Sequence, residues 1–165
     1  FRPLGRLDRH TTGLCLIAKN KLTSVQLAHG IEKEYIAIAE GVYAEKEGTV
    51  CAPLLRVPGS TIMRKVDPAG QESITHFKVL AQYKDHALLS LRLETGRTHQ
   101  IRVHMAYLGH PLAGDALYGG KTDSIGRQAL HCARLRCTLN GKEIKVESPL
   151  PEDMKELLEK QAGKA

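Results

Sequence analysis

The dipeptide Asn140-Gly141 separates two runs with the composition of β-strands, residues 130–139 and 143–147. Asn-Gly between two such runs is a strong signal for a two-residue turn, because both turn positions need a positive φ that Asn and Gly tolerate. A two-residue turn joins antiparallel strands. This part of the chain therefore predicts a β-hairpin and favours a fold with antiparallel strands.

Further short runs of the same kind occur along the chain. Leu89, Leu91 and Leu93 alternate with polar residues, as on a strand with one buried face. Strands are expected at residues 13–18, 33–39, 61–66, 73–83 and 86–94, and the first of them is wholly apolar and expected to be buried. Helices are expected at residues 22–29, 99–108 and 152–161, and loops at 53–60 and 114–126. The expected fold class is α+β, a mostly antiparallel mixed sheet with a few flanking helices, in a single domain over residues 1–165.

Charge and composition narrow the class of protein. The 165 residues carry a formal net charge of +6. The excess lies in residues 1–140, because residues 141–165 hold five Lys against six Asp or Glu. A basic body favours a polyanionic partner such as nucleic acid. Since no run approaches the roughly 20 apolar residues of a membrane-spanning helix and no leader opens the chain, we expect a cytoplasmic protein without a membrane partner.

Two further features concern the state of the chain. Its four cysteines form no Cys-x-x-Cys pair, so we expect reduced thiols rather than a disulfide framework. The chain begins at Phe1, and the polar cluster that starts at Gly5 is expected to leave no room for an element before it. We therefore expect a fragment of a longer protein.

A polar cluster at residues 5–13 (GRLDRHTTG) runs directly into the apolar segment. Its one carboxylate, Asp8, lies between Arg6 and Arg9. Neighbouring guanidinium groups favour an ionised carboxylate, which suits a nucleophile or base rather than a general acid. The alternative interpretation is an exposed Arg-Asp-Arg ion pair, worth about 0 to 1 kcal/mol.

A second cluster, residues 94–104 (ETGRTHQIRVH), follows a strand and opens the helix expected at 99–108, with Thr98 as its N-cap. Unpaired backbone N–H groups at such a helix start favour a phosphate, and Arg97 could add a bidentate contact. Arg102, one turn further, could reach a carboxylate or a base in a cleft. The alternative is a helix start whose charges are only solvated.

Three other features have competing interpretations. His99 and His104 lie about 140° apart around a helix axis, so they do not share one face as a metal pair would. Residues 114–122 (GDALYGGKT) resemble a phosphate-binding loop. That motif has four residues between its first Gly and the final Gly-Lys-Thr, whereas this segment has five, which argues against it. Tyr35 could stack on an unstacked base, or it could be an ordinary half-buried strand residue.

Together these segments resemble the RluA-type family of RNA pseudouridine synthases. The resemblance rests on residues 6–13, 33–35, 97–104 and 109–119, with later landmarks at 130–133 and 148–151. It implies the catalytic fold of that family. It also implies the isomerisation of uridine to pseudouridine in structured RNA, with ribosomal RNA expected before transfer RNA, by a monomer that needs no cofactor and no metal.

The resemblance further implies roles for single residues. Asp8 matches the family's nucleophile, which acts on a flipped-out uridine, and Arg102 matches its ion-pair partner. Tyr35 is expected to stack on the uracil and to help remove the proton from carbon 5, while Arg6 fills the gap that the base leaves. The residues expected to bind RNA are Arg6, Arg9, Thr11, Lys33, Arg97, His99 and Gln100.

Three features depart from the family pattern. Gly5 stands where the RluA type has His, as in the sister RsuA type, and Thr12 stands where Ser is frequent. The strands that precede the Arg-Leu-Asp segment in the family are not part of this sequence. The last departure keeps a second hypothesis open, namely a catalytically silent RNA-binding fragment.

Overall fold

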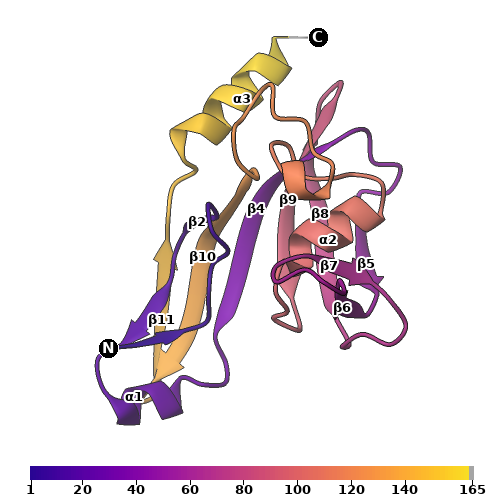
Figure 1. Cartoon of the computed structure of the whole chain (residues 1–165). Coiled ribbons are helices and arrows are strands. Elements are labelled where there is room, and N and C mark those ends of the chain that lie inside the picture. Colours follow the sequence, from indigo (N-terminus) through magenta and orange to yellow (C-terminus); the bar gives the residue numbers. More distant parts are fainter. Residues whose placement is uncertain (164–165) are drawn as a thin grey trace.

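The computed structural model describes residues 1–163, which form one large sheet with helices packed against it (Figure 1). The strands are β1 (Arg2–Leu4), β2 (Thr12–Gly13), β3 (Leu16–Ala18), β4 (Glu32–Glu40), β5 (Glu47–Cys51), β6 (Leu54–Arg56), β7 (Arg64–Val66), β8 (Ile74–Gln82), β9 (His86–Leu93), β10 (Leu130–Leu139) and β11 (Lys142–Glu147). The helices are α1 (Lys21–Gln26), α2 (Gln100–Tyr107), α3 (Glu152–Ala162) and the 3-10 helix η1 (Ala116–Tyr118).

The seven-stranded sheet has the order β11-β10-β4-β9-β8-β5, and β2 pairs with the start of β10. Neighbours along this path are antiparallel, whereas β2 runs parallel to β10. Two small two-stranded sheets, β1-β3 and β6-β7, complete the set. The expected α+β class with a mostly antiparallel sheet is confirmed.

The hairpin expected around Asn140-Gly141 is confirmed. β10 and β11 pair up to Leu139 and Lys142, which leaves the two residues between them as the turn. Asn140 has φ 50° and Gly141 has φ 76°. Two positive φ values in a two-residue turn match the right-handed twist of the flanking strands.

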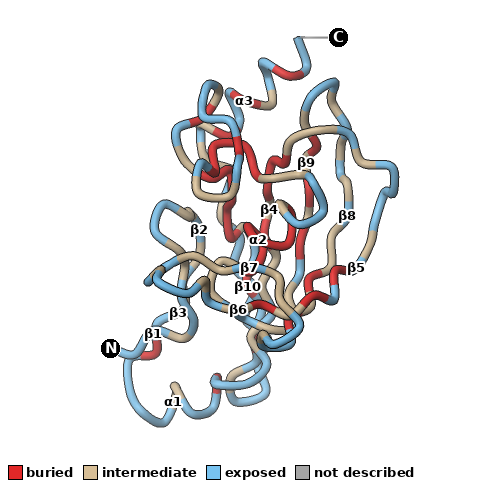
Figure 2. Tube along the Cα trace, turned by 45° about the vertical axis from the view of Figure 1, so that its right-hand side comes forward, coloured by how far each residue is buried: buried red, intermediate tan, exposed pale blue. Residues whose placement is uncertain are grey.

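Different helices cover the two faces of the sheet. Ala37 and Ile38 are neighbours on β4 and therefore point to opposite faces. Ala37 belongs to the apolar cluster that contains Met105 of α2, whereas Ile38 packs with Met154 of α3. Figure 2 shows the buried residues concentrated along the central strands β4 and β9. None of the helices within residues 1–163 is long and apolar enough to cross a membrane.

Most of the remaining elements agree with the sequence predictions. The alternation on β9 is confirmed, since Leu89 and Leu91 are fully buried and Arg92 is exposed. The strands expected at 33–39, 73–83 and 86–94 are β4, β8 and β9, and the helix expected at 152–161 is α3. The expected strand at 61–66 is reduced to β7, and α1 is shorter than the helix expected at 22–29.

The prediction of one buried strand at residues 13–18 is wrong. The segment is divided between β2 and β3, which have different partners, and Ile17 is 52% exposed. The division follows from Gly13, whose φ of 110° turns the chain where it passes against Cys132 of β10. The expectation that no element precedes Gly5 is also wrong, because β1 pairs there with β3.

Two local predictions need correction as well. Residues 53–60 are not all loop, because they contain β6, which pairs with β7. Thr98 does not cap α2. The N-cap is His99, which has a left-handed backbone with φ 57° and makes no side-chain capping bond.

Gly13→Ala is expected to lower the free energy of unfolding by at least about 2 kcal/mol. A side chain in the left-handed region costs about 1–2 kcal/mol, and the added carbon would overlap the backbone of Cys132. Chemical denaturation measures the loss. Gly30→Ala is the matched control, because Gly30 has φ 94° but open space around it. Equal losses of unfolding free energy in the two variants would show that the contact between Gly13 and the backbone of Cys132 does not matter for stability.

Candidate active site

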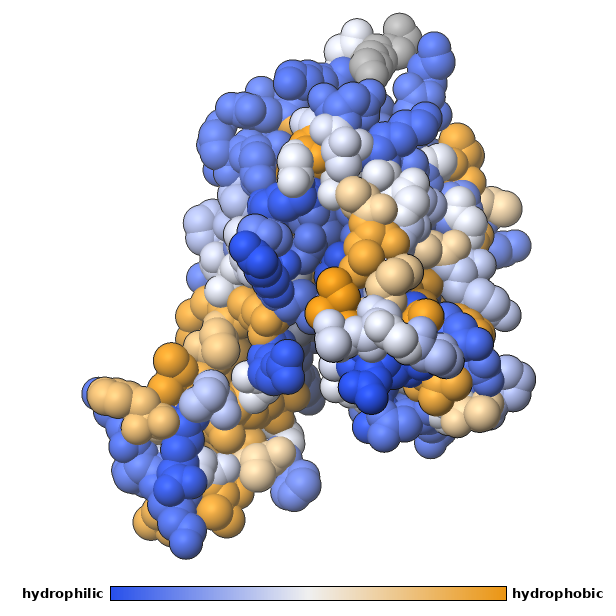
Figure 3. Space-filling view, in the orientation of Figure 1, coloured by the Kyte–Doolittle hydropathy of each residue, from blue (hydrophilic) through white to orange (hydrophobic). Residues whose placement is uncertain are grey.

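A cleft of about 450 Å³ lies between the N-terminal loop and the start of α2. Its walls come from the loop around Asp8, from Lys33 and Tyr35 of β4, from the β9–α2 connection at residues 93–101, and from Leu130. Figure 3 shows the hollow between the N-terminal part at the lower left and the part that carries β6 and β7. The sheet brings these distant segments of the chain together.

Asp8 lines the cleft, and its side chain is 22% exposed. Its Oδ2 lies 3.8 Å from Nη1 of Arg102. Within residues 1–163 neither Arg6 nor Arg9 forms an ion pair with Asp8, so the exposed Arg-Asp-Arg ion pair considered from the sequence does not form. The Thr11 N–H donates to the Asp8 carbonyl at 3.0 Å, which folds the chain back directly after the carboxylate.

Arg102 is held mainly by a residue that the sequence analysis did not select. Its Nε and Nη2 donate to the two oxygens of Asp115, each at 2.8 Å, and both side chains are buried. Burial opposes the charge on Arg102, but the hydrogen bonds and charge of Asp115, with a smaller contribution from Asp8, outweigh it and raise the pKa of the guanidinium. This bidentate pair leaves Nη1 of Arg102 directed at Asp8.

His99 lines the cleft and hydrogen bonds to Tyr118 behind it. Nδ1 of His99 lies 2.6 Å from the Tyr118 hydroxyl, which accepts the backbone N–H of Arg64 at 3.1 Å. Burial, followed by the charge of Arg102, lowers the pKa of His99. A neutral His99 that accepts at Nδ1 carries its proton on Nε2, and this N–H can donate to a ligand.

Tyr35 lines the cleft but is 93% buried, with a relative exposure of 7%. Burial, with smaller contributions from Cys132 and Asp8, raises the pKa of its hydroxyl. The phenol therefore stays protonated at neutral pH. Tyr35 also belongs to the apolar core cluster, so little of it is accessible from the cleft.

Gln100 lines the cleft but is buried, and its side chain hydrogen bonds within the protein. Its side-chain oxygen accepts from Thr95 Oγ1 at 2.8 Å and from the Arg97 N–H at 3.0 Å. Its side-chain nitrogen donates to the Ile74 carbonyl at 2.9 Å and to Thr75 Oγ1 at 3.0 Å. Gln100 therefore stabilises the turn before α2, with both side-chain polar atoms hydrogen bonded inside the protein.

The basic residues expected to bind RNA have different positions. Arg6, Lys33 and Arg97 line the cleft, as does Thr11, whereas Arg9 does not. Nε of Arg97 donates to the Glu72 carbonyl at 3.1 Å, which restrains the guanidinium of this exposed side chain. The structure therefore gathers a positively charged rim around Asp8 and leaves Arg9 outside it.

The second histidine of the α2 segment lies inside the protein. His104 is fully buried, and its two ring nitrogens contact Thr75 Oγ1 at 2.8 Å and the Ala52 carbonyl at 2.9 Å. Burial lowers the pKa of His104. Across residues 1–163 there is no group of three or more His, Cys, Asp or Glu side chains arranged to hold a metal ion.

The sequence analysis missed Asp115 and Tyr118 as site residues, although both lie in the 109–119 segment that contributed to the resemblance. The sequence signal was that Asp115 is the one carboxylate and Tyr118 the one Tyr of this glycine-rich segment. Only the fold shows that this loop lies behind Arg102, with the guanidinium carbon 5.1 Å from the centre of the Tyr118 ring.

Comparison with known proteins gives consistent matches. A family model described as RNA pseudouridylate synthase matches residues 1–107. The chain is 48% identical over 160 residues to the protein named Uncharacterized RNA pseudouridine synthase YjbO of Bacillus subtilis (strain 168), covering 93% of this chain and 56% of that protein. It is 39% identical over 175 residues to Ribosomal large subunit pseudouridine synthase D of Escherichia coli (strain K12), covering 93% of this chain and 53% of the relative.

The fold is similar to a solved structure, that of Human RNA Pseudouridylate Synthase Domain Containing 1. The TM-score is 0.81 at 28% sequence identity, and the match covers 90% of this chain and 69% of the human chain. The chain spans about half the length of the curated relatives that it matches.

Asp115→Asn is expected to lower the free energy of unfolding by about 3 kcal/mol, because removing one partner of a buried ion pair leaves the other charge uncompensated. Urea denaturation measures the loss. Glu147→Gln is the control, since Glu147 is 74% exposed where it pairs with Arg134, and exposed pairs contribute about 0–1 kcal/mol. A loss for Asp115→Asn no larger than the control would show that Asp115 does not anchor Arg102.

Proposed function

Since this chain belongs to the RNA pseudouridylate synthase family, we propose that it isomerises specific uridines in structured RNA to pseudouridine, with Asp8 as the nucleophile. The observation that carries the proposal is Asp8 on the wall of a cleft of about 450 Å³, beside a buried and anchored Arg102. The reaction breaks the bond from uracil N1 to ribose carbon 1′. It forms a bond from uracil carbon 5 to carbon 1′, while the proton on carbon 5 is lost and N1 gains one.

The position of Asp8 suits this chemistry. An ionised carboxylate can act at the uracil ring or at ribose carbon 1′, and in both cases it must reach a base that has left its stack. Arg102 supplies a positive charge 3.8 Å from the Asp8 carboxylate. Its position is fixed by the two hydrogen bonds that it donates to Asp115. The carboxylate is therefore held at the cleft without being covered by its partner.

We assign Tyr35 the stacking surface for the displaced uracil. Base–aromatic stacking is worth about 1–3 kcal/mol per base and does not depend on ionisation of the ring. The raised pKa of Tyr35 argues against its phenolate as the base that removes the proton from carbon 5.

The rim of the cleft would hold the RNA around the target. Arg6, Lys33, Arg97 and His99 all line the cleft, where cations and a neutral imidazole N–H can contact phosphates and uracil oxygens. In this proposal Arg6 takes the place that the flipped base leaves. Arg9 lies outside the cleft and would contact RNA only beyond the target nucleotide.

Ribosomal RNA is the proposed substrate class, with transfer RNA second. The support is that several relatives, including the one in Escherichia coli, are named ribosomal large subunit pseudouridine synthases. Those relatives are bacterial, and bacterial ribosomal RNA is made in the cytoplasm, so the proposal includes a cytoplasmic location. We propose that the protein acts as a monomer on this RNA.

Asp8→Asn is expected to abolish turnover and to leave RNA affinity within a few-fold, because the nucleophile stabilises the transition state more than the bound ground state. The measurement is release of tritium from RNA labelled at uracil carbon 5, since substitution at that carbon expels the label. RNA binding is measured in parallel. Release by neither protein, with intact RNA binding, would favour a silent RNA-binding fragment over an enzyme.

Arg97→Ala is expected to weaken RNA binding and to reduce the magnitude of its salt-dependence slope by about 1, as loss of one phosphate contact does. Filter binding across a range of salt concentrations measures both effects. Arg136→Ala is the matched control, because Arg136 is an exposed β10 residue that pairs with Glu32 and does not line the cleft. The same change in both variants would show that the cleft rim is not the RNA contact.

A further inference from the structure

The backbone immediately after Asp8 is strained. His10 has φ 71°, in the left-handed region that only a few per cent of non-glycine residues adopt, His, Asn and Asp most often among them. Such a conformation is unfavourable for a residue with a side chain and persists only where the surrounding structure holds it. His10 is exposed, so burial of its own side chain does not hold it.

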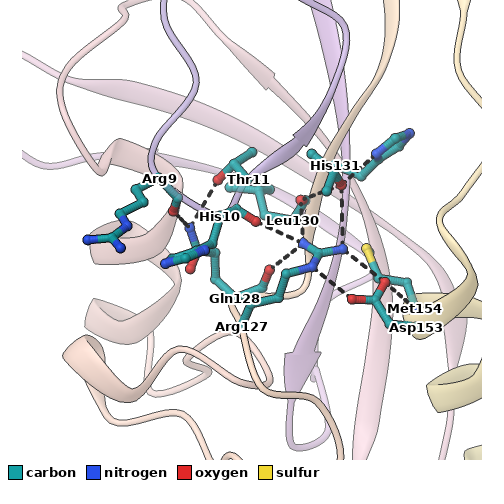
Figure 4. Close-up of polar contacts among 10 residues, drawn as sticks. Arg9, His10, Thr11, Arg127, Gln128, Leu130, His131, Asp153 and Met154 are labelled. Carbon is teal, nitrogen blue, oxygen red and sulfur yellow. Dashed lines mark hydrogen bonds and ion pairs between the residues drawn. The ribbon is translucent and has the colours of Figure 1, made fainter.

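Arg127 supplies contacts to this strained segment (Figure 4). Its Nη1 donates to the carbonyl of His10 at 3.1 Å, and its Nη2 donates to Thr12 Oγ1 at 3.4 Å. The same Nη1 also donates to the carbonyls of Gln128 and Leu130, at 3.0 and 3.4 Å, which ties the guanidinium to the start of β10. One side chain therefore connects the segment after Asp8 to the sheet.

The neighbouring Gln128 contacts the other two residues of the segment, Arg9 and Thr11. It is 5% exposed, and its side-chain nitrogen donates to the Arg9 carbonyl at 2.6 Å and to Thr11 Oγ1 at 3.2 Å. Arg127 and Gln128 thus contact every residue from Arg9 to Thr12. In Figure 4 the Arg9 side chain points away from this network, so the contact at that position is made by the backbone alone.

Arg127 is itself fixed by α3. Its Nε and Nη2 donate to the two carboxylate oxygens of Asp153 at 2.8 and 2.9 Å. Asp153 lies in the first turn of α3, and the next residue, Met154, is fully buried in the cluster on the far face of the sheet. None of the described α3 residues lines the cleft. Helix α3 is therefore linked to the segment after Asp8 through the Arg127–Asp153 ion pair, and not through residues that line the cleft.

We propose that Arg127, anchored on Asp153, is a positioning residue that holds the segment after Asp8 and thereby fixes the direction of the Asp8 carboxylate. The effect on catalysis rests on the proposed function, in which Asp8 is the nucleophile. The effect on the structure of residues 9–12 rests on the hydrogen bonds of Arg127 and Gln128. Arg127 does not line the cleft, so in this proposal it acts through the segment after Asp8 and not on the substrate. It makes α3 part of the support of the active site.

The experiment uses Arg127→Lys and Asp153→Asn, which keep the size of each side chain but remove the bidentate fork. Arg136→Lys is the control, an exposed Arg of β10 that pairs with Glu32 and Glu143. Amide hydrogen exchange is measured over the peptide that spans residues 7–14, with thermal denaturation of each variant alongside. Tritium release from labelled RNA is measured at saturating and at limiting RNA.

The expected result is faster exchange confined to residues 7–14 in the two test variants and unchanged exchange in the control. Turnover at saturating RNA should fall by about 10- to 100-fold, as a small misplacement of a reacting group causes, with KM little changed. Unchanged exchange at 7–14, or exchange that rises evenly over the whole chain, overturns the proposal. If the wild-type chain releases no tritium, the proposed function fails, and the exchange result alone decides whether Arg127 holds the segment.

Discussion

The buried ion pair between Arg102 and Asp115 is the interaction on which the site depends. Two charges removed from water are costly, and only good geometry with further hydrogen bonds offsets that cost. Here two bonds of 2.8 Å join the guanidinium to both carboxylate oxygens, and the ring of Tyr118 lies beside it. The pair also joins α2 to the loop that precedes η1, so the wall of the cleft cannot shift without separating the charges.

Asp8 is supported from two directions. Arg102 and Asp115 act from the side of α2, on one face of the sheet, and Arg127 and Asp153 act from α3, whose core contacts are on the other face. Asp8, the proposed nucleophile, lies on a loop that lines the cleft. Rigid elements on both faces restrict that loop, which is how a site on irregular backbone can still hold a defined geometry.

Much of the fold could be predicted from the sequence, because its signals are local. Alternation along β9 and the Asn140-Gly141 turn each specify one element without information from elsewhere. The division of residues 13–18 could not be predicted, since an apolar run does not show that Gly13 must pass against β10. Asp8, Tyr35 and Arg102 were found through the resemblance, whereas Asp115 and Arg127 act through contacts with distant segments, which a local pattern does not contain.

The placement of β2 has a consequence for how the protein folds. Thr12 hydrogen bonds to His131, and these residues are 119 positions apart in the chain. Parallel pairing over such a separation is slow, because the entropy of closing the loop is lost before any contact is gained. During synthesis the segment around Asp8 leaves the ribosome before its partners on β10 and α3 have been made. The candidate active site therefore depends on segments that are made later in the chain, and its support is complete only when α3 has docked.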